Sequence, residues 1–401
     1  MEEEEEVIVV REYDAERDRH GVEAVERMCE VGPSGKLCLF TDLLGDPLCR
    51  IRHSPASLML VAETTNGPVR EIVGLVRGCI KTVSCGTHNP HRFPARHHTH
   101  LFTKVAYLLG LRVSPYHRRR GIGLKLVRRM EEWFREMGAE YSYMATDKDN
   151  EASVRLFTER CGYSKFRTPS ILVNPVFAHR LPLPRRAQII RLPPREAEML
   201  YRLRFASVEF FPRDIDAVLS NSLSLGTFLA VEGSFEWRGA ESFLAEPPES
   251  WAVASVWNCK EVFRLEVRGA SRWRRGFART SRLVDRAFSW LRIPSVPDLF
   301  RPFGLYFLYG VGGEGCGATR LVTALCRHVH NMARDGGCSV VAAEVAACEP
   351  LRAGIPHWGR LSCAEDLWCV KRLAEEYSDG ALGDWTKKPP GPSIFVDPRE
   401  F

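Results

Sequence analysis

Apolar positions along this chain follow two different periods, which predict short strands alternating with amphipathic helices. Apolar runs at residues 7–10, 58–63, 72–80 and 106–113 predict strands, and a first helix is expected at about 21–30. Between residues 122 and 137, large apolar side chains return every three or four positions, so they share one face of a longer helix. Gly138 ends this helix, and residues 140–146 predict a further strand.

The same order of elements occurs again in the second half. Strands are expected at 188–191, 228–232, 251–257, 305–311 and 339–345, with helices at 195–207 and 319–333 and an arginine-rich helical insert before 305. The proline-rich residues between the halves predict a stiff, extended linker. We therefore expect tandem domains, divided as an acidic tail at 1–6, a first domain at 7–180, the linker at 181–187 and a second domain at 188–401.

The segment between Val113 and the helix that follows carries the clearest chemical signal. Its core reads Arg118-x-x-Gly121-x-Gly123. Two glycines let the backbone approach a ligand closely, and the free N–H groups at a helix start form an anion site. Positively charged arginines are unfavourable at the positive end of a helix dipole unless a bound anion compensates their charge. The loop therefore predicts a pyrophosphate ligand.

The glycine loop of the second half, at residues 315–317, lacks these features. If it is matched to Gly121–Gly123, Gly312 stands where the first loop has Arg118, and Glu314 adds a negative charge. The segment imitates a P-loop, but Ala318 replaces the phosphate-binding lysine. It also imitates a dinucleotide fingerprint, without an acidic residue at the expected distance of about 20 residues. We expect the second copy to be degenerate and structural.

A second signature follows the strand at 140–146. It reads Asn150-x-x-Ser153-x-x-Leu156-Phe157-x-x-x-Cys161-Gly162-Tyr163. Together with the arginine–glycine loop, and in this order, it resembles the GCN5-related N-acetyltransferase (GNAT) superfamily. The segments 163–169 and 395–401 extend the likeness, so that nearly the whole chain is similar to the plant Hookless family of probable N-acetyltransferases.

The resemblance implies an α/β fold with a mixed sheet and acetyl-CoA as the cosubstrate. With the repeated pattern and the altered second loop, it gives tandem GNAT-like domains of which the second is degenerate. It implies that the strand backbone at 111–113 pairs with the pantetheine arm and polarises the thioester carbonyl. Asn150 would bond the pantetheine or thiol region, although an asparagine there is equally typical of a helix N-cap. The cofactor-binding residues implied are Leu111, Arg112, Val113, Arg118, Arg119, Arg120, Gly121, Ile122, Gly123, Asn150, Ser153 and Phe157.

The pattern does not identify the groups that would move protons. In this superfamily the position of Phe157 is often a tyrosine that protonates the leaving thiolate, and general acid–base catalysis contributes about 10²–10⁴-fold. A free thiol has a pKa of about 8.5, so CoA can leave without full protonation. For the base, the weak candidates are Glu63, Glu71 and Tyr107, each of which is also typical of an ordinary strand or strand end.

Residues 88–100 contain five histidines. Such a cluster could bind zinc. The interspersed arginines would repel a cation, and no cysteine or carboxylate lies within the run. We favour a polar lid beside the acceptor site and expect no metal.

Composition restricts the compartment and the partners. The thirteen cysteines form no C-x-x-C pair, and glutamates follow Met1 instead of a signal peptide, so we expect reduced thiols in the nucleus or cytoplasm and no secretion. The chain has no run of about 18 apolar residues, so no membrane partner is expected. A net charge of +6 is mild, and no basic stripe is interleaved with aromatics, so no direct nucleic-acid binding is expected. A homo-oligomer is possible.

Two functions follow from these patterns. The first is an acetyl-CoA-dependent N-acetyltransferase that acts on a protein lysine, histone tails included, or on another small amine. The Hookless resemblance implies a plant regulator of growth and hormone response. The alternative is a catalytically weak acyl-CoA-binding protein that recruits partners.

Overall fold

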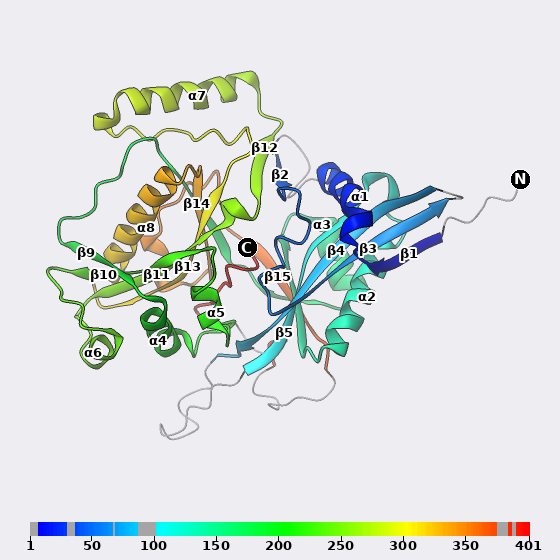
Figure 1. Cartoon of the computed structure of the whole chain (residues 1–401), viewed down its shortest axis with the longest axis horizontal. Coiled ribbons are helices and arrows are strands. Elements are labelled where there is room, and N and C mark those ends of the chain that lie inside the picture. Colours follow the sequence, from blue (N-terminus) through cyan, green and yellow to red (C-terminus); the bar gives the residue numbers. More distant parts are fainter. Residues whose placement is uncertain (1–6, 30–36, 67–68, 87–101, 375–383, 387–389) are drawn as a thin grey trace, which may run out of the picture.

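The computed structural model describes residues 7–29, 37–66, 69–86, 102–374, 384–386 and 390–401. The chain forms a seven-stranded sheet, a six-stranded sheet and a two-stranded sheet, with helices packed on the two larger ones (Figure 1). This architecture confirms the predicted α/β fold and agrees with a tandem GNAT-like arrangement. Among the described residues, no helix has both the length and the apolar character to cross a bilayer.

The first sheet has the strand order β1-β3-β4-β5-β6-β15-β7. Its neighbours are antiparallel except for β5 and β6, which run parallel. The strands are β1 (Val7–Glu12), β3 (Ala56–Asn66), β4 (Val69–Ser84), β5 (Phe102–Val113), β6 (Tyr141–Asp147), β7 (Ser164–Arg167) and β15 (Asp366–Arg372).

The second sheet has the order β8-β14-β13-β11-β10-β9, and again one pair, β13 and β14, is parallel. Its strands are β8 (Ser170–Pro175), β9 (Ala187–Leu192), β10 (Ser224–Glu232), β11 (Trp251–Asn258), β13 (Leu305–Glu314) and β14 (Val340–Val345). The small sheet joins the halves, because it pairs β2 (Cys38–Asp42) with β12 (Arg264–Arg268).

Helices α2 (Ile122–Glu136) and α8 (Ala318–Asp335) lie where the apolar spacing predicts them. The first helix, expected from about residue 21, begins earlier, at Ala15, because the Asp14 side chain caps it there. In the first half, α2 packs on β4, and in the second half α8 packs on β11. The described helices are α1 (Ala15–Met28), α2 (Ile122–Glu136), α3 (Glu151–Arg155), α4 (Pro194–Phe205), α5 (Ile215–Leu219), α6 (Ala240–Ala245), α7 (Arg272–Ala287) and α8 (Ala318–Asp335). A π-helical turn, η2 (Leu156–Arg160), continues α3.

Two glycines on β4 set how closely α2 approaches the sheet. A Cβ at Gly78 would lie 2.5 Å from the sulfur of Met130, and a Cβ at Gly74 would lie 3.0 Å from the Ile122 side chain. Because Ile122 and Met130 are fully buried, a larger residue on β4 would push the helix away. The close contact fixes the start of α2 against the end of β5, where the predicted anion loop lies.

The two halves exchange strands. β8 precedes the proline-rich residues 181–187 but pairs with β14 of the second sheet, whereas β15 inserts between β6 and β7 of the first. The linker lies on α8, where the Asn331 side chain bonds both the N–H and the C=O of Leu181, at 2.8 and 2.9 Å. The boundaries predicted near residues 180 and 188 therefore do not coincide with the division between the sheets, and they stay predictions about domains.

The last described segment, residues 390–401, runs between the halves near the centre of the molecule (Figure 1). The buried guanidinium of Arg399 pairs with Asp397 at 2.7 Å and with Asp214 at 2.6 Å. Phe401 stacks on Phe307 of β13, with ring centroids 4.0 Å apart. Burial opposes the charge of Asp397, but Arg399 and Lys81 hold its pKa well below the usual range. The segment thus ties both halves into one interior.

The two halves repeat one frame, which consists of a short parallel strand pair, a glycine bulge and a long helix. They repeat it more closely than the sequence motifs indicate. β5 pairs with β6 over Val105–Leu108, and β13 pairs with β14 over Leu305–Leu308. Each leading strand then has a bulge at a glycine of positive φ, Gly110 at +62° and Gly310 at +58°. The expected match of 315–317 to Gly121–Gly123 is therefore wrong: Gly317 is the N-cap of α8, as Gly121 is of α2. Likewise Gly312 lies within β13 and not at the position of Arg118.

Candidate functional site

The backbone of β5 and β6 separates after Leu108 and Met144, which are the last paired residues of the two strands. We call the opening beyond this point the fork. One arm of the fork is β5, which stays paired with β4 up to Val113. The other arm is β6, which stays paired with β15 up to Asp147. Among the described residues, no strand therefore lies beside the backbone groups of 109–113 that face β6. Such an edge suits a ligand that itself offers amides.

The predicted residues Leu111, Arg112 and Val113 lie along this fork and are half-buried. The carbonyl of Leu111 accepts from Arg112 Nη1 at 3.1 Å, and that of Val113 accepts from Arg118 Nε at 3.4 Å. The Arg112 side chain also turns toward Glu26, at 3.6 Å. Burial lowers the pKa of Arg112. Two carbonyls of this strand thus accept from arginine side chains.

The loop of residues 114–121 leads from the fork into α2. Arg119 has φ +64° and Gly121 has φ +77°, and Gly121 is the N-cap of α2. Left-handed residues close to a helix start turn successive N–H groups toward one point, which makes an anion-binding concavity. A Cβ placed on Gly121 would meet no atom of the described residues within 4 Å. The loop is therefore open where an anion would sit.

Gly123 is the second residue of α2. A Cβ there would lie 3.4 Å from Leu156 and 3.8 and 3.9 Å from Val113 and Leu111. It would fill the space between the end of β5 and the turn that follows α3. Ile122, the first residue of α2, is buried, whereas Arg118, Arg119 and Arg120 are exposed around the loop. The structure thus brings the predicted loop residues together around one opening.

The second signature forms α3 and η2. Asn150 caps α3, and its Oδ1 accepts from the Ser153 N–H at 3.2 Å. Phe157 is almost completely buried and packs edge-on against Tyr163 at 5.2 Å. The Tyr163 hydroxyl bonds Ser142 at 2.7 Å, within the paired part of β6. Phe157 therefore lies in the core, and it offers the fork neither a proton nor an exposed face.

On the face of β5 and β6 that looks toward the second half, three aromatic rings line up. Tyr107 stacks on Tyr143 at 4.7 Å, and Tyr143 stacks on Trp368 of β15 at 5.4 Å. Trp368 pairs with Ala145, just past the last β5–β6 pair. These rings form a floor beside the point where the strands separate, and Tyr107 is the one base candidate that the structure places there.

A carboxylate from the second half reaches this floor. Trp368 Nε1 donates to Glu344 Oε1 at 3.0 Å, and Glu344 keeps part of its surface exposed. Burial and the charge of Asp366 raise the pKa of Glu344 to about 8. Burial likewise raises the pKa of Asp366 to about 7, and Asp147 lies opposite Asp366 in the register of β6 and β15. Carboxyls with such raised pKa values suit proton transfer near neutral pH.

The sequence reasoning missed Glu344 as a site residue. The available signal was a glutamate within an otherwise apolar strand, Val-Val-Ala-Ala-Glu-Val. A buried carboxyl needs a partner. Its partner Trp368 lies on β15, and the strand exchange that brings β15 beside β6 could not be predicted from the pattern.

The remaining base candidates lie elsewhere. Glu63 is on β3, two strands away from β5, and its carboxylate pairs with Arg11 at 2.7 Å and with Arg17 at 2.5 Å. Burial opposes the charge of Glu63, but its hydrogen bond to Arg11 lowers its pKa. Glu71 is an exposed residue near the start of β4. Neither lies at the fork, so the structure does not support them as catalytic bases.

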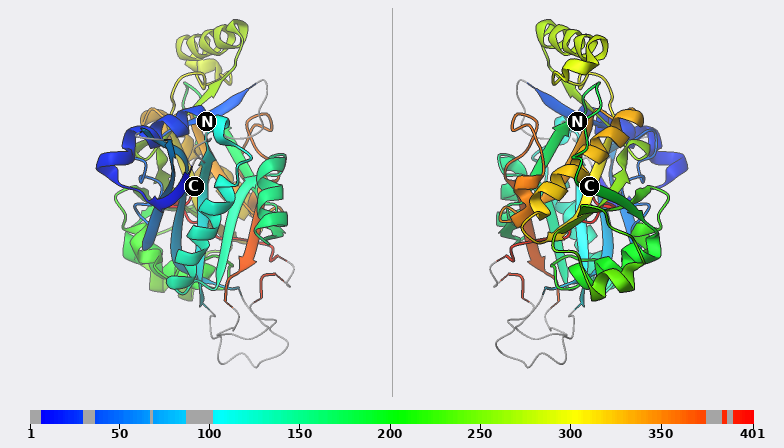
Figure 2. Two further views of the ribbon diagram at one scale, coloured as in Figure 1. Left: turned by 90° about the vertical axis from the view of Figure 1, so that its right-hand side faces the viewer. Right: turned by 90° about the vertical axis from the view of Figure 1, so that its left-hand side faces the viewer.

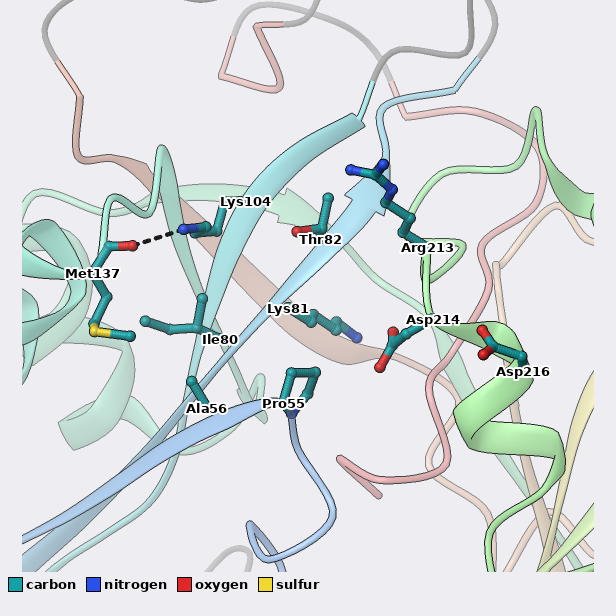
Figure 3. A pocket seen from close by; sticks show the side chains of 10 residues that line it. All are labelled: Pro55, Ala56, Ile80, Lys81, Thr82, Lys104, Met137, Arg213, Asp214 and Asp216. Carbon is teal, nitrogen blue, oxygen red and sulfur yellow. Dashed lines mark hydrogen bonds between the residues drawn. The ribbon is translucent and has the colours of Figure 1, made fainter.

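A pocket of about 500 Å³ opens at the other end of β5, around Lys104 (Figure 3). Its wall includes Lys81 from β4 and Asp214 from the second half, whose side chains point toward one another. Lys81 Nζ lies 2.7 Å from Glu400, and Glu400 accepts from the Tyr143 hydroxyl at 2.5 Å. Polar contacts therefore connect this pocket with the aromatic floor.

The loop of the second half is closed by its own chain. The N–H of Gly317 donates to Ser250 Oγ at 3.0 Å. A Cβ on Gly317 would lie 2.4 Å from the Glu232 carboxylate, and one on Gly315 would lie 1.9 Å from the Glu249 carbonyl oxygen. A carboxylate thus occupies the anion position at the start of α8. This geometry fits the expectation that the second copy is degenerate.

Some predictions fall outside this description. The acidic tail and the histidine-rich residues 88–100 lie outside the described residues. Within the part that is described, no group of three His, Cys, Asp or Glu side chains is arranged to hold a metal ion. The thirteen cysteines are free thiols.

Comparison with known proteins places this geometry in a family. Residues 30–163 match the family model described as "Acetyltransferase (GNAT) family". The chain is 63% identical over 410 residues to "Probable N-acetyltransferase HLS1-like" of Arabidopsis thaliana, with 98% of this chain and 99% of that one covered. It is 64% identical to "Probable N-acetyltransferase HLS1" of the same plant, with 98% and 100% covered. "Acetyl transferase GW6a" of Oryza sativa subsp. japonica is 41% identical, with 98% of each chain covered.

Solved structures share the fold at low identity. A fungal protein with a GCN5-related glucosamine N-acetyltransferase region aligns with a TM-score of 0.53 at 13% identity, covering 92% of this chain and 38% of that one. Saccharomyces cerevisiae N-myristoyltransferase with bound myristoyl-CoA aligns with a TM-score of 0.51 at 8% identity, covering 91% and 79%. Acetyl-CoA is the cosubstrate that this fold and family entail. The chain belongs to the GNAT family of acetyltransferases, among the HLS1-like probable N-acetyltransferases.

Proposed function

We propose that this protein transfers the acetyl group of acetyl-CoA to a primary amine, with a protein lysine, histone tails included, as the acceptor class. The observation that carries this proposal is the open fork of β5 and β6, which meets the open loop 114–121 on one side and Glu344 on the other. A place in the nucleus or cytoplasm, and a role in plant growth and hormone response, belong to the proposal through the family resemblance. Their support is the high identity to the HLS1-like relatives.

The fork and the loop fit the cosubstrate. N–H groups around Gly121 would hold the pyrophosphate, with the exposed arginines 118–120 supplying positive charge. The β5 backbone at 111–113 would pair with the amides of the pantetheine arm. Asn150 already uses Oδ1 as the cap of α3, so its contact with the arm would come from Nδ2. When bound, the thioester supplies an activated acetyl carbon beside the aromatic floor.

Glu344 is the proton acceptor in this proposal. A lysine amine is protonated at neutral pH, because its unperturbed pKa is about 10.4. The carboxyls of Glu344, Asp366 and Asp147 attract the ammonium group to the end of the fork. Glu344 then takes one proton, and the nitrogen lone pair is free to form the new C–N bond. The Trp368 N–H orients the carboxylate for this transfer.

The leaving sulfur departs without a dedicated acid. Breaking the C–S bond leaves the electron pair on sulfur, and the thiolate is moderately stable because a thiol has a pKa of about 8.5. The nitrogen loses its second proton once the C–N bond has formed, and this proton passes through solvent to the thiolate. Phe157 cannot supply a proton. This absence favours a slow enzyme, and it is the observation that supports the alternative of an acyl-CoA-binding interaction protein.

The test is the variant Glu344→Gln, assayed for acetyl transfer to a panel of histone and other lysine peptides between about pH 6 and 10. The native protein should gain kcat/KM as pH rises through about 8, because Glu344 must be deprotonated to act. The variant should lose about 10²–10⁴-fold in kcat/KM and the inflection at about pH 8. It should keep only the rise set by the lysine amine, whose pKa is about 10.4, and its CoA affinity should be unchanged.

The matched control is Glu365→Gln. Glu365 is an exposed neighbour of Asp366 that pairs with Lys148, and its removal should leave the rate unchanged. If the Glu344→Gln variant kept the native kcat/KM and the native change of kcat/KM at about pH 8, Glu344 would be excluded as the proton acceptor. Tight CoA binding by the native protein without turnover on any peptide would select the binding-protein alternative.

A further inference from the structure

Helix α7 stands apart from both large sheets, at the outer edge of the molecule (Figures 1 and 2). It follows β12 and is succeeded by a short turn, η4 (Ser289–Leu291). It is not part of the fork or of the loop of residues 114–121. Its surface is nevertheless the most unusual of the described chain, because its apolar side faces away from the protein.

Polar contacts fasten the body-facing side of α7. Ala278 and Asp285 are each about 1% exposed on this side. The Asp285 carboxylate accepts from the Ala178 N–H at 2.7 Å, from Ser295 Oγ at 2.5 Å, and pairs with His179 at 2.6 Å. Arg282 donates to the Val176 carbonyl at 2.5 Å. Because a buried carboxylate with three partners holds the helix, its apolar side chains are not needed for attachment.

The outward side is apolar. Trp273, Phe277 and Val284 fall within a sector of about 40° at 3.6 residues per turn. Trp273 is 89% exposed and Phe277 is 67% exposed. The apolar surface continues past the end of the helix, and its exposed large side chains are Trp273, Phe277, Leu283, Val284, Phe288, Trp290, Leu291 and Ile293. Large apolar patches of this kind mark interaction sites in soluble folds.

Arginines form a second exposed stripe on α7. Arg272, Arg275, Arg279 and Arg286 are exposed and fall within a sector of about 60°, centred about 150° around the helix from the apolar stripe. The only acidic residue in α7 is Asp285, which is already paired on the body side. The surface that α7 presents is therefore apolar and strongly basic, and its charge complements an acidic partner.

We propose that α7 and η4 form a peripheral docking surface for an anionic phospholipid bilayer. A basic helix with Trp, Phe and Leu on one side is typical of helices that lie in the membrane interface. Two exposed tryptophans, one at each end of the segment, suit the headgroup depth. The arginines would contact lipid phosphates. This differs from the expectation of no membrane partner, which rested on the absence of a spanning segment.

A bilayer fits this surface better than a protein groove does. A groove accepts the straight row of Trp273, Phe277 and Val284, but it does not cover the apolar residues of the irregular chain after the helix. Trp290, Leu291 and Ile293 lie in that part. A fluid surface covers both parts at once. Nucleic acid would use the arginines but would leave the apolar stripe in water.

The test uses the full chain and vesicles of phosphatidylcholine, either alone or with about 30 mol % phosphatidylserine. Co-sedimentation should show binding to the anionic vesicles that weakens as salt rises from about 0.05 to 0.5 M, with a blue shift of tryptophan fluorescence. The double variant Trp273→Ser/Phe277→Ser should remove the shift and most of the binding. The triple variant Arg275→Gln/Arg279→Gln/Arg286→Gln should lose about fivefold per arginine.

The matched control is Leu203→Ser, which removes an exposed apolar side chain from α4, with 67% exposure in the native chain. It should bind vesicles as the native chain does, and CoA affinity should be unchanged in every variant. Absence of binding to anionic vesicles would overturn the proposal, as would equal binding by the α7 variants. If no vesicle binding were found, sedimentation velocity could show a dimer that depends on α7, and the proposal would be overturned in favour of a second copy of the chain. A complex with duplex DNA that depends on α7, again without vesicle binding, would overturn it in favour of nucleic acid.

Discussion

The loops that lead into α2 and α8 occupy the same place in the two halves, yet one is open and the other is filled. Both follow a strand with a glycine bulge, at Gly110 and Gly310, and both begin a long amphipathic helix. The first loop spans residues 114–121, whereas the second spans only 315–317. Within the described part of the chain, an added Cβ at Gly121 would meet nothing within 4 Å, whereas at Gly315 it would meet a carbonyl oxygen at 1.9 Å.

The difference shows that the frame and the ligand site are separate properties of this fold. The bulge, the short parallel pairing and the helix are needed to build each sheet, and both halves keep them. The anion site depends on the intervening residues alone. In the second half, Ser250 takes the Gly317 N–H and the Glu232 carboxylate lies at the start of α8, so the chain supplies its own acceptors.

The largest effect is expected for Gly315→Ala. Its methyl group would overlap the Glu249 carbonyl, and alanine would also have to adopt φ +86°. Backbone cannot move aside as a flexible side chain can, so we expect a loss on the order of 3 kcal/mol of unfolding free energy. Chemical denaturation of the full chain measures this loss. CoA affinity of the remaining folded protein should not change.

Gly233→Ala is the control for that substitution. Gly233 has φ +77°, and an added Cβ would meet nothing within 4 Å, so only the backbone conformation is penalised, by about 1–2 kcal/mol. If Gly315→Ala were no more costly than Gly233→Ala, the second loop would not be closed as described.

The sequence was sufficient for the frame because the frame is local. Apolar periodicity located α2, α8 and the central strands of both sheets, and the glycines of the first loop pointed to an anion. The sequence was insufficient for the second loop. That loop is shorter than the first, so matching its glycines 315–317 to Gly121–Gly123 gave the wrong correspondence. It also missed Glu344 and Trp368, which meet only because β15 crosses into the first sheet. Such long-range pairing leaves no periodic signal in either segment.

A smaller but more specific effect is expected for Gly121→Asp. The side chain would enter open space without displacing protein atoms, but it would place a negative charge where the pyrophosphate binds. Losing a charge-assisted contact costs about 1.5–3 kcal/mol, or about 10–100-fold in CoA affinity. Isothermal titration gives the affinity, and thermal unfolding should show a nearly native transition.

Gly162→Asp serves as its control, because Gly162 has φ +74° and an equally open Cβ position outside the loop. It should carry the same backbone cost without loss of CoA binding. Equal CoA affinity in Gly121→Asp and Gly162→Asp would contradict the assignment of the first loop to the pyrophosphate.

The smallest effect is expected for Ser250→Ala, which removes the acceptor that closes the second loop. The Gly317 N–H is buried with Ser250 and would lose its 3.0 Å bond, at a cost of about 1–3 kcal/mol. The Glu232 carboxylate would stay at the start of α8, held by Arg320 at 2.9 Å, so the variant should gain no second CoA site. Titration should still give one CoA per chain. A stoichiometry of two would mean that Ser250 alone keeps the second half from binding, and that the two halves differ by one side chain instead of by loop length and charge.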